Sequence, residues 1–157
     1  MPQEIEHKFL LKNDNWKTEI SKSVQYKQGY LISDKTRSVR IRTSDNQAWL
    51  NIKSATIGTS RQEFEYEIPF DEGLEILTTL CEKPIIEKIR HFVTFKQHLW
   101  EIDVFSGDNL GLTVAEVELS AIGESFEKPN WLGKEVTEDI RYYNNSLCKN
   151  PYKNWSA

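Results

Sequence analysis

The sequence predicts a mainly β (α+β) fold, in which about eight antiparallel strands are joined by two or three short helices. Charged and apolar side chains alternate with a period of two along most of the chain, which is the side-chain period of a β-strand. Polar turn sequences such as Ser44-Asp45-Asn46 separate consecutive alternating segments, as they do in β-hairpins. Apolar residues recur at helical spacing in only a few short segments.

The first alternating segment, from Gln3 to Leu10, sets the pattern for the other strands. It places the charges of Glu4, Glu6 and Lys8 on one face and its apolar side chains on the other. Nearly every later strand is likewise charged on one parity and apolar on the other. We expect these later strands at residues 25–32, 39–42, 48–53, 63–68, 86–93, 100–105 and 114–119.

Three helices are expected beside these strands. A short connector lies around Trp16 to Lys22. An amphipathic helix has Asp71 as its N-cap and ends before Pro84, and its apolar side should pack on the sheet. A final helix, capped by Thr137, follows after the alternation stops. The apolar side of that final helix would consist of Ile140, Tyr143 and Leu147.

The composition is that of a globular protein with one core. The 157 residues are 38% hydrophobic and 28% charged, with seven Gly and five Pro, which excludes a disordered or fibrous chain. A chain of this length is the size of one domain, so we expect a single domain over residues 1–157. The net charge of −4 argues against a general nucleic-acid binder, because such proteins usually present a basic face to the phosphates.

We expect the protein to act in the cytoplasm and away from membranes. No apolar run is long enough to cross a bilayer, and the first residues lack the basic and then apolar pattern of a signal peptide. Cys81 and Cys148 do not have the spacing of metal ligands, and a reducing compartment suits them.

The charges are segregated by sign, which bears on the choice between two architectures. In one, the apolar faces form an ordinary sandwich or barrel core and the charges lie in water. In the other, the sheet closes into an eight-stranded barrel whose lumen is charged and whose outer face is covered by helices; such a barrel can hold one small ligand. A solvated face would mix signs along a strand, so the segregation favours the second. The residues of the charged parity are Glu4, Glu6, Lys8, Arg40, Arg42, Lys53, Glu63, Glu65, Glu67, Lys88, Arg90, Glu101, Asp103, Glu116 and Glu118.

A charged lumen implies a charged ligand, because each unpaired buried ion costs roughly several kcal/mol. The lumen cations suit an elongated polyanion, since Arg forks match phosphate oxygens and Lys acts as a point charge. The carboxylates would repel that polyanion unless divalent cations such as Mg²⁺ or Mn²⁺ lay between them.

The same residues resemble the signature of a known family. Glu4-Ile5-Glu6-His7-Lys8 is similar to the Glu-x-Glu-x-Lys motif of the CYTH superfamily, the triphosphate tunnel metalloenzymes. The resemblance covers essentially the whole chain and is strongest to compact bacterial inorganic tripolyphosphatases. The further motifs that carry it are Gln28-Gly29-Tyr30-Leu31, Arg40-x-Arg42, Leu50-Asn51-Ile52-Lys53, Arg61-Gln62-Glu63-Phe64-Glu65, Glu87-Lys88-x-Arg90, Glu101-x-Asp103-x-Phe105, Glu116-Val117-Glu118 and Glu135-Val136-Thr137-x-Asp139-x-Arg141-Tyr142.

The resemblance implies an antiparallel eight-stranded tunnel, with a C-terminal helix at one mouth, that binds a triphosphate with divalent metal ions. It implies catalytic roles for Lys8, which would bind phosphate or position the attacking water, and for Tyr30, which would orient that water. Mg²⁺ or Mn²⁺ would be the cofactor, and a homodimer is possible because family members are often dimeric. The implied substrate-binding residues are Lys8, Arg40, Arg42, Lys53, Lys88 and Arg90. The implied metal-site and further acidic lining residues are Glu4, Glu6, Glu63, Glu65, Asp103, Glu116 and Glu118.

Several activities stay open at this point. Metal-dependent hydrolysis of inorganic tripolyphosphate to pyrophosphate and phosphate is preferred. A class IV-type adenylyl cyclase would also need an adenine pocket, for which no residues can be identified. Thiamine triphosphate hydrolysis could use Trp16 or Trp49 for stacking, although both are typical packing residues. A non-catalytic polyphosphate- or nucleotide-binding module would not need the carboxylate pairs of the first and last strands.

Overall fold

The strands form one sheet that closes on itself. The computed structural model describes residues 3–55, 57 and 59–155, and nine strands lie in this part of the chain. Their order is β5-β4-β3-β2-β6-β7-β8-β1-β9, and β5 also pairs with β1, so that eight strands make a closed antiparallel ring with β9 added outside it. The strands are β1 (Gln3–Leu11), β2 (Lys22–Ser33), β3 (Arg37–Thr43), β4 (Ala48–Ser54), β5 (Ser60–Ile68), β6 (Ile86–Phe95), β7 (His98–Phe105), β8 (Thr113–Glu118) and β9 (Leu132–Glu135).

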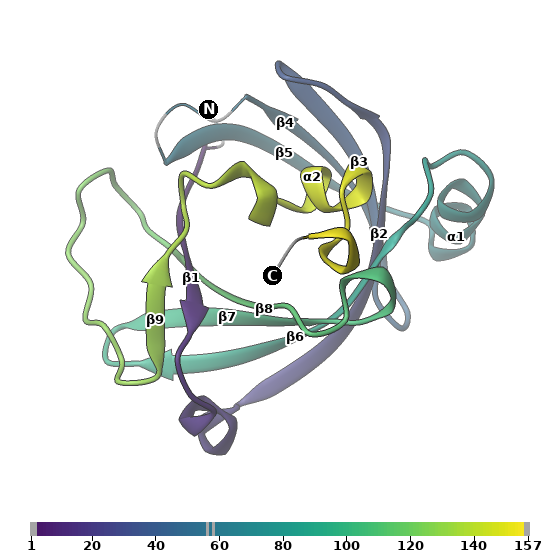
Figure 1. The fold of residues 1–157 in the computed structure, drawn as a ribbon. Helices are drawn as coiled ribbons and strands as arrows, with labels where there is room; N and C mark the ends of the chain where they lie inside the picture. The colour runs from purple at the N-terminus through teal and green to yellow at the C-terminus, as the bar shows by residue number, and fades with distance from the viewer. Residues whose placement is uncertain (1–2, 56, 58, 156–157) are drawn as a thin grey trace.

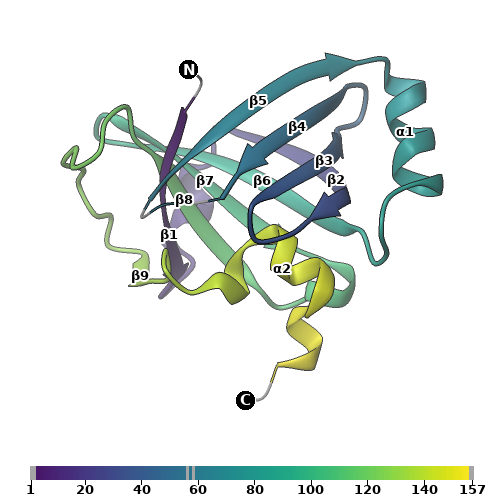
Figure 2. The ribbon, with the colours of Figure 1, turned by 90° about the horizontal axis from the view of Figure 1, so that it is seen from above.

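The helices are short, and they lie both outside the ring and at one of its ends. In Figure 1 the strands surround α2, whereas α1 lies outside the ring, where it contacts β3 and β4. The view turned by 90° places α2 at one end of the strands (Figure 2). None of the described helices is long and apolar enough to cross a membrane. The helices are η1 (Asn15–Glu19), α1 (Phe70–Thr79), η2 (Gly107–Asn109), η3 (Ile140–Tyr142), α2 (Asn144–Lys149) and η4 (Tyr152–Asn154).

β1 closes the ring because it changes its partners along its length. Residues 3–5 pair with β5, residues 6–10 pair with β8, and Phe9 and Leu11 pair with β9. A strand has two edges for hydrogen bonding. One edge of β1 pairs with β8, and the other edge pairs first with β5 and then with β9. The predicted barrel of eight antiparallel strands is therefore confirmed.

The apolar core lies on the outer faces of the strands and not in the centre of the ring. Its largest cluster packs Phe9, Trp100 and Trp131 beneath the segment before β9, and each of these side chains is at most 1% exposed. A second cluster joins Ile41 of β3 to Leu77 of α1. The charged side chains of the same strands point the other way, into the ring. This arrangement excludes the alternative in which the charges lie in water around an apolar interior.

A third cluster fills one end of the ring. Tyr30, Ile86 and Phe105 point inward there and pack around Leu147 of α2, which is fully buried. The prediction of a C-terminal helix at one mouth is thus confirmed, but its details are wrong. The predicted helix after Thr137 is split into η3 and α2, and Ile140 is 73% exposed.

Thr137 does not cap a helix because its hydroxyl is used elsewhere. Its Oγ1 accepts a hydrogen bond from the backbone N–H of Lys8 at 3.0 Å and donates to Glu135 at 2.6 Å. Asp139 caps η3 instead, by accepting from the N–H of Arg141. The hydroxyl of Thr137 thereby fastens the C-terminal segment to β1.

β9 and the start of α1 also differ from the expectation. The sequence predicts no strand at the residues of β9, because the alternation stops before them. Gly133 is needed there, since a Cβ at this position would lie 2.9 Å from the carbonyl oxygen of Leu10. α1 begins at Phe70 after Pro69, so that Asp71 lies in its first turn and does not act as the N-cap.

Close packing of α1 on the sheet generates a first prediction. A Cβ added at Gly73 would overlap the methyl group of Ala48, which is fully buried. We expect Gly73→Ala to lower the free energy of unfolding by about 1–3 kcal/mol, because overpacking outweighs the gain of about 1 kcal/mol in helix propensity. Urea unfolding would measure this, with the exposed Glu72→Ala as a control. Adding Ala48→Gly should restore stability; a Gly73→Ala protein as stable as wild type would contradict the packing.

Candidate active site

An ionic cavity of about 190 Å³ lies inside the ring of strands. Seven carboxylates and six cations face one another among its described lining residues, so the segregated charges of the sequence meet there. Of the residues predicted for the site, Tyr30, Lys88 and Asp103 are buried beside the cavity and the others line it. The lining residues are Glu4, Glu6, Lys8, Arg40, Arg42, Lys53, Arg61, Glu63, Glu65, Arg90, Glu101, Glu116, Glu118 and Asn144.

Opposite walls of the ring carry opposite charges. β8 contributes Glu116 and Glu118, and β3 contributes Arg40 and Arg42. In the cyclic strand order β8 and β3 are four strands apart, which are opposite positions in a ring of eight. The period of two turns alternate residues of each strand inward. A carboxylate wall therefore faces a guanidinium wall across the cavity.

Lys8 is fixed between two carboxylates on the negative wall. Its Nζ lies 2.7 Å from Glu116 Oε1 and 3.1 Å from Glu6 Oε1, and its side chain is 2% exposed. Burial opposes the charged form, but the attraction of Glu116 and Glu6 raises the pKa of Lys8 above its ordinary value. Lys8 is therefore a cation held in place inside the cavity.

The carboxylates beside Lys8 are not all neutralised. Glu6 and Glu118 are directly opposite each other on β1 and β8, where like charges repel. Burial and then the charge of Glu116 raise the pKa of Glu6 to about 7, and burial and the nearby Glu4 and Glu101 raise the pKa of Glu118 to about 7. Glu116 differs: burial would raise its pKa, but Lys8, Arg90 and Lys88 together lower it. Glu6 and Glu118 thus lack sufficient positive charge.

The charge of Glu4 is balanced by two cations, Lys53 and Arg61. The sequence analysis did not predict Arg61 as a site residue. Lys53 lies 3.3 Å and Arg61 lies 2.9 Å from the carboxylate of Glu4. Burial would raise the pKa of Glu4, but these two cations hold it well below its ordinary value. Arg61 has the same strand parity as Glu63 in β5, and this parity was the signal that could have placed it in the lumen.

An ion cluster lies in the cavity wall formed by β6 and β7, where Lys88 and Asp103 are buried and Arg90 lines the cavity. Arg90 binds both oxygens of Asp103, with Nε at 2.7 Å and Nη2 at 2.9 Å, and Lys88 binds the same carboxylate at 2.8 Å. Burial, together with repulsion by Arg90, lowers the pKa of Lys88 to about 8, although the attraction of Asp103 opposes this shift. This geometry favours Asp103 as the counter-ion of two phosphate-binding candidates; its role at a metal stays a prediction.

The guanidinium wall has donors without acceptors. In the described part of the chain, the buried Nε atoms of Arg40 and Arg42 and the side-chain amide of Gln28 have no hydrogen-bond partner. Arg42 also lies over the rings of Tyr26, 4.5 Å from the centroid, and Trp49, 5.2 Å from the centroid. Burial and repulsion by Arg40 and Arg90 lower its pKa. An anion at this wall would satisfy these donors.

Tyr30 lies at the α2 end, next to the cavity. Its ring packs in the apolar cluster with Leu147, and its side chain is directly opposite Arg40 on β3. Burial raises the pKa of Tyr30, and Arg40 opposes this shift in part. Its water-orienting role stays a prediction.

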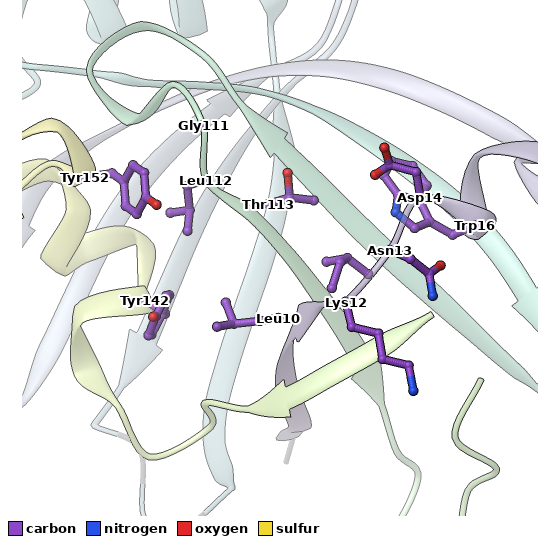
Figure 3. Close-up of a pocket in the computed structure, with 11 residues that line it drawn as sticks. Leu10, Lys12, Asn13, Asp14, Trp16, Gly111, Leu112, Thr113, Tyr142 and Tyr152 are labelled. Carbon is purple, nitrogen blue, oxygen red and sulfur yellow. The ribbon is translucent and has the colours of Figure 1, made fainter. Parts of the chain in front are cut away.

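A second hollow, of about 360 Å³, lies outside the ring and is separate from the ionic cavity. Figure 3 shows Leu10 and Tyr142 on one side of it and Lys12 and Trp16 on the other. Its loop residue Asn13 is already bonded to the backbone of its own chain. Lys12 and Asp14 are the charged residues in its described lining, so it has far fewer charges than the ionic cavity.

The fold and the site define a class of protein, namely a closed antiparallel tunnel whose ionic lumen suits a polyanion. The chain belongs to the CYTH domain family, whose model matches residues 2–152. It is 49% identical over 155 residues to an inorganic triphosphatase of Acetivibrio thermocellus, covering 99% of both chains. It is 35% identical over 150 residues to an inorganic triphosphatase of Nitrosomonas europaea, covering 92% of this chain and 96% of that protein. The crystal structure of an inorganic triphosphatase also matches, with 34% identity, a TM-score of 0.66 and coverage of 94% and 95%.

The family implies a divalent metal cofactor, and the chemistry of the site fits one. Hard divalent ions prefer carboxylate oxygens, which the negative wall supplies. The raised pKa values of Glu6 and Glu118 show that this wall needs added positive charge. Among the described residues, no three Asp, Glu, His or Cys side chains converge as a ready-made metal site. The negative wall therefore fits a divalent ion by its carboxylate donors and by its need for positive charge. The described carboxylates are not already arranged as a set of metal ligands.

The Asp103 cluster generates a second prediction. Removing its negative charge in Asp103→Asn would leave Lys88 buried without an ion pair among the described residues, and would leave Arg90 with Glu101 alone. We expect a loss of about 3–5 kcal/mol in the free energy of unfolding. Chemical denaturation would measure it, with Glu67→Gln at the exposed end of β5 as the control. Equal stability of Asp103→Asn and Glu67→Gln would refute the structural role.

The raised pKa of Glu6 generates a third prediction. Its pKa rises from 4.5 to about 7 on folding, so its contribution to stability is full below pH 4.5 and is lost as the pH rises through about 7. Metal-free protein should therefore lose stability across this window. Glu6→Gln, which imitates the protonated form, should remove that part of the loss. Urea unfolding at several pH values in the presence of a chelator would compare the two proteins, and identical pH dependences would rule the assignment out.

Proposed function

We propose that this chain is a divalent-metal-dependent phosphohydrolase that splits inorganic tripolyphosphate into pyrophosphate and phosphate. The observation that carries the proposal is a single cavity in which unsatisfied guanidinium donors face under-neutralised carboxylates. The two curated relatives, at 49% and 35% identity, are both inorganic triphosphatases, which supports the same reaction.

The two walls would bind different groups. Arg40, Arg42 and Lys53 would hold phosphate oxygens, because guanidinium forks and ammonium groups match them. Glu6 and Glu118, with Glu4 and Glu116 beside them, would hold Mg²⁺ or Mn²⁺. When bound, a divalent ion supplies Lewis-acid charge to the reacting phosphate. The substrate would then lie between the walls.

Lys8 is the principal catalytic residue of the proposal. Its ammonium is positively charged, buried and aimed into the cavity from the carboxylate wall. A fixed cation of this kind stabilises the charge that develops on phosphate oxygens during phosphoryl transfer. Tyr30 would orient the attacking water from the α2 end of the cavity. Lys88 and Arg90, held by Asp103, would add positive charge beneath the phosphates.

The size of the cavity favours an inorganic substrate. Its volume of about 190 Å³ is below the 300–1,000 Å³ that is typical of pockets for drug-sized ligands, so an adenosine or thiamine group would have to lie outside it. Trp16 is a core residue, 2% exposed, and Arg42 already covers the ring of Trp49. Neither tryptophan is therefore free to stack on a base, which argues against the cyclase and thiamine triphosphatase alternatives.

The remaining expectations on location and partners belong to the same proposal. Cys81 and Cys148 are free and buried, which suits a reducing cytoplasm. The substrate would be a small triphosphate, without a nucleic-acid or membrane partner. The possible homodimer stays a prediction.

A substrate panel tests the proposal. Purified protein would be incubated with tripolyphosphate, ATP and thiamine triphosphate, with and without Mg²⁺ or Mn²⁺, and the products identified. We expect phosphate and pyrophosphate from tripolyphosphate, and only when metal is present. Cyclic AMP from ATP would favour the cyclase, and binding without turnover would favour the non-catalytic module.

Lys8→Ala should lower kcat for tripolyphosphate by about 100-fold or more, since removing one preorganised donor typically costs this much. Lys12→Ala, in the exposed residue that follows β1, is the matched control and should keep normal turnover. Circular dichroism would show that both variants are folded. Near-normal phosphate release by folded Lys8→Ala would remove the catalytic assignment.

A further inference from the structure

A groove of about 850 Å³ opens at the α2 end of the ring, beside the apolar cluster around Leu147. One side of it is formed by the turn between β2 and β3 and by the adjoining ends of β3 and β4. The other side is formed by η3, α2 and the residues before them. α2 therefore covers only part of this end, and the groove occupies the rest.

The groove leads to the ionic cavity. Arg61 lines both, so the two spaces meet at its side chain. Tyr143 lines the groove next to it, and its ring centroid lies 5.9 Å from Arg61 Cζ and 4.9 Å from Lys8 Nζ. A small anion that moved along the groove would thus arrive beside Arg61 and Lys8.

The walls of the groove carry an excess of positive charge. Lys35, Arg37 and Lys149 are exposed on it, and with Arg61 they make four cations against two carboxylates, Asp34 and Glu138. This excess stands out in a chain whose net charge is −4. Within the described chain Lys35 has no ion pair, and Arg37 reaches Asp34 only at 3.8 Å.

The opposite end of the tunnel is acidic. Glu65 and Glu67 follow Arg61 along β5 at the same parity, and Glu67 is roughly 20 Å further along the strand. Glu101 of β7 and Glu118 of β8 are further carboxylates of the cavity lining. A polyanion approaching there would be repelled, whereas the groove would attract it.

We propose that the polyphosphate anion enters the tunnel through this groove, where Lys35, Arg37 and Lys149 form an outer anion-binding surface. The proposal rests on the triphosphatase function above and adds the route of its substrate. Clefts lined by charges of one sign raise the rate of capture of an oppositely charged ligand by about 10- to 1,000-fold. The three side chains act before catalysis, so they should affect capture and leave the chemical step unchanged.

Charge reversal in the groove tests the route. Lys35→Glu combined with Arg37→Glu should lower kcat/KM for tripolyphosphate by about tenfold or more at low salt, with kcat unchanged. The difference from wild type should shrink near 1 M salt, where the Debye length is about 3 Å. The matched control combines Lys12→Glu with Lys17→Glu, exposed residues near η1 that make the same change in net charge, and it should keep kcat/KM close to wild type. Thermal unfolding would show that each variant is folded.

Two results would overturn the proposal. One is an equal kcat/KM for the groove variant and the control variant. The other is a rise in kcat/KM for Glu67→Lys with no effect of the groove variant, which would place the entrance at the acidic end.

Binding measured without turnover separates this proposal from the proposed function. Titration calorimetry of tripolyphosphate in the presence of a chelator would compare wild type with the groove variant at low salt. Weaker binding by the variant supports the route even if the wild type proves inactive, and equal affinities contradict it. Inactivity of the wild type in the substrate panel would by itself refute only the hydrolase assignment.

Discussion

The pairing of β1 with β5 is the constraint on which the rest of the structure depends. It closes eight strands into a ring, and closure turns every second residue of each strand toward a common interior. Thirteen charged side chains line the resulting cavity, although burying a lone ion costs roughly several kcal/mol. They are tolerated because they neutralise one another across strands, as Lys8 does with Glu116 and Arg61 does with Glu4.

The charges of some of these groups are fully balanced within the fold, whereas the charges of others are only partly balanced. Asp103 is bound by Arg90 and Lys88 on both of its oxygens, so its charge is balanced within the fold. Glu6 on one wall and Arg42 on the other are left with too little opposite charge or with an unused donor. A core optimised only for stability would not retain such groups, because each unsatisfied buried polar atom costs about 1–3 kcal/mol. A substrate and its metal would supply the missing charges.

Most of the fold and much of the site followed from the period of two alone. All eight predicted strands exist, and the inward residues of β1, β3 and β8 are those of the charged parity. Arg61 obeys the same rule, since it has the strand parity of Glu63 and Glu65 in β5. β9 and the split of the final helix could not be read from local pattern, because docking onto β1 decides them. Thr137 bonds the backbone of Lys8, 129 residues away, and no periodicity reports such a contact.

That docked C-terminal segment joins the stability of the fold to access to the site. Leu147 fills the apolar half of one tunnel end, and within the same segment Asn144 accepts a hydrogen bond from Lys88 while Tyr143 lies beside Lys8 and Arg61. The C-terminal segment therefore closes the part of this tunnel end that is lined by apolar side chains. The part lined by polar side chains stays open as the groove. The ring by itself would have two open mouths of unlike charge. With α2 in place, the basic mouth is a groove that ends at Arg61, so the entry route that we propose would bring an anion to Arg61 and Lys8 before the carboxylates of the far end.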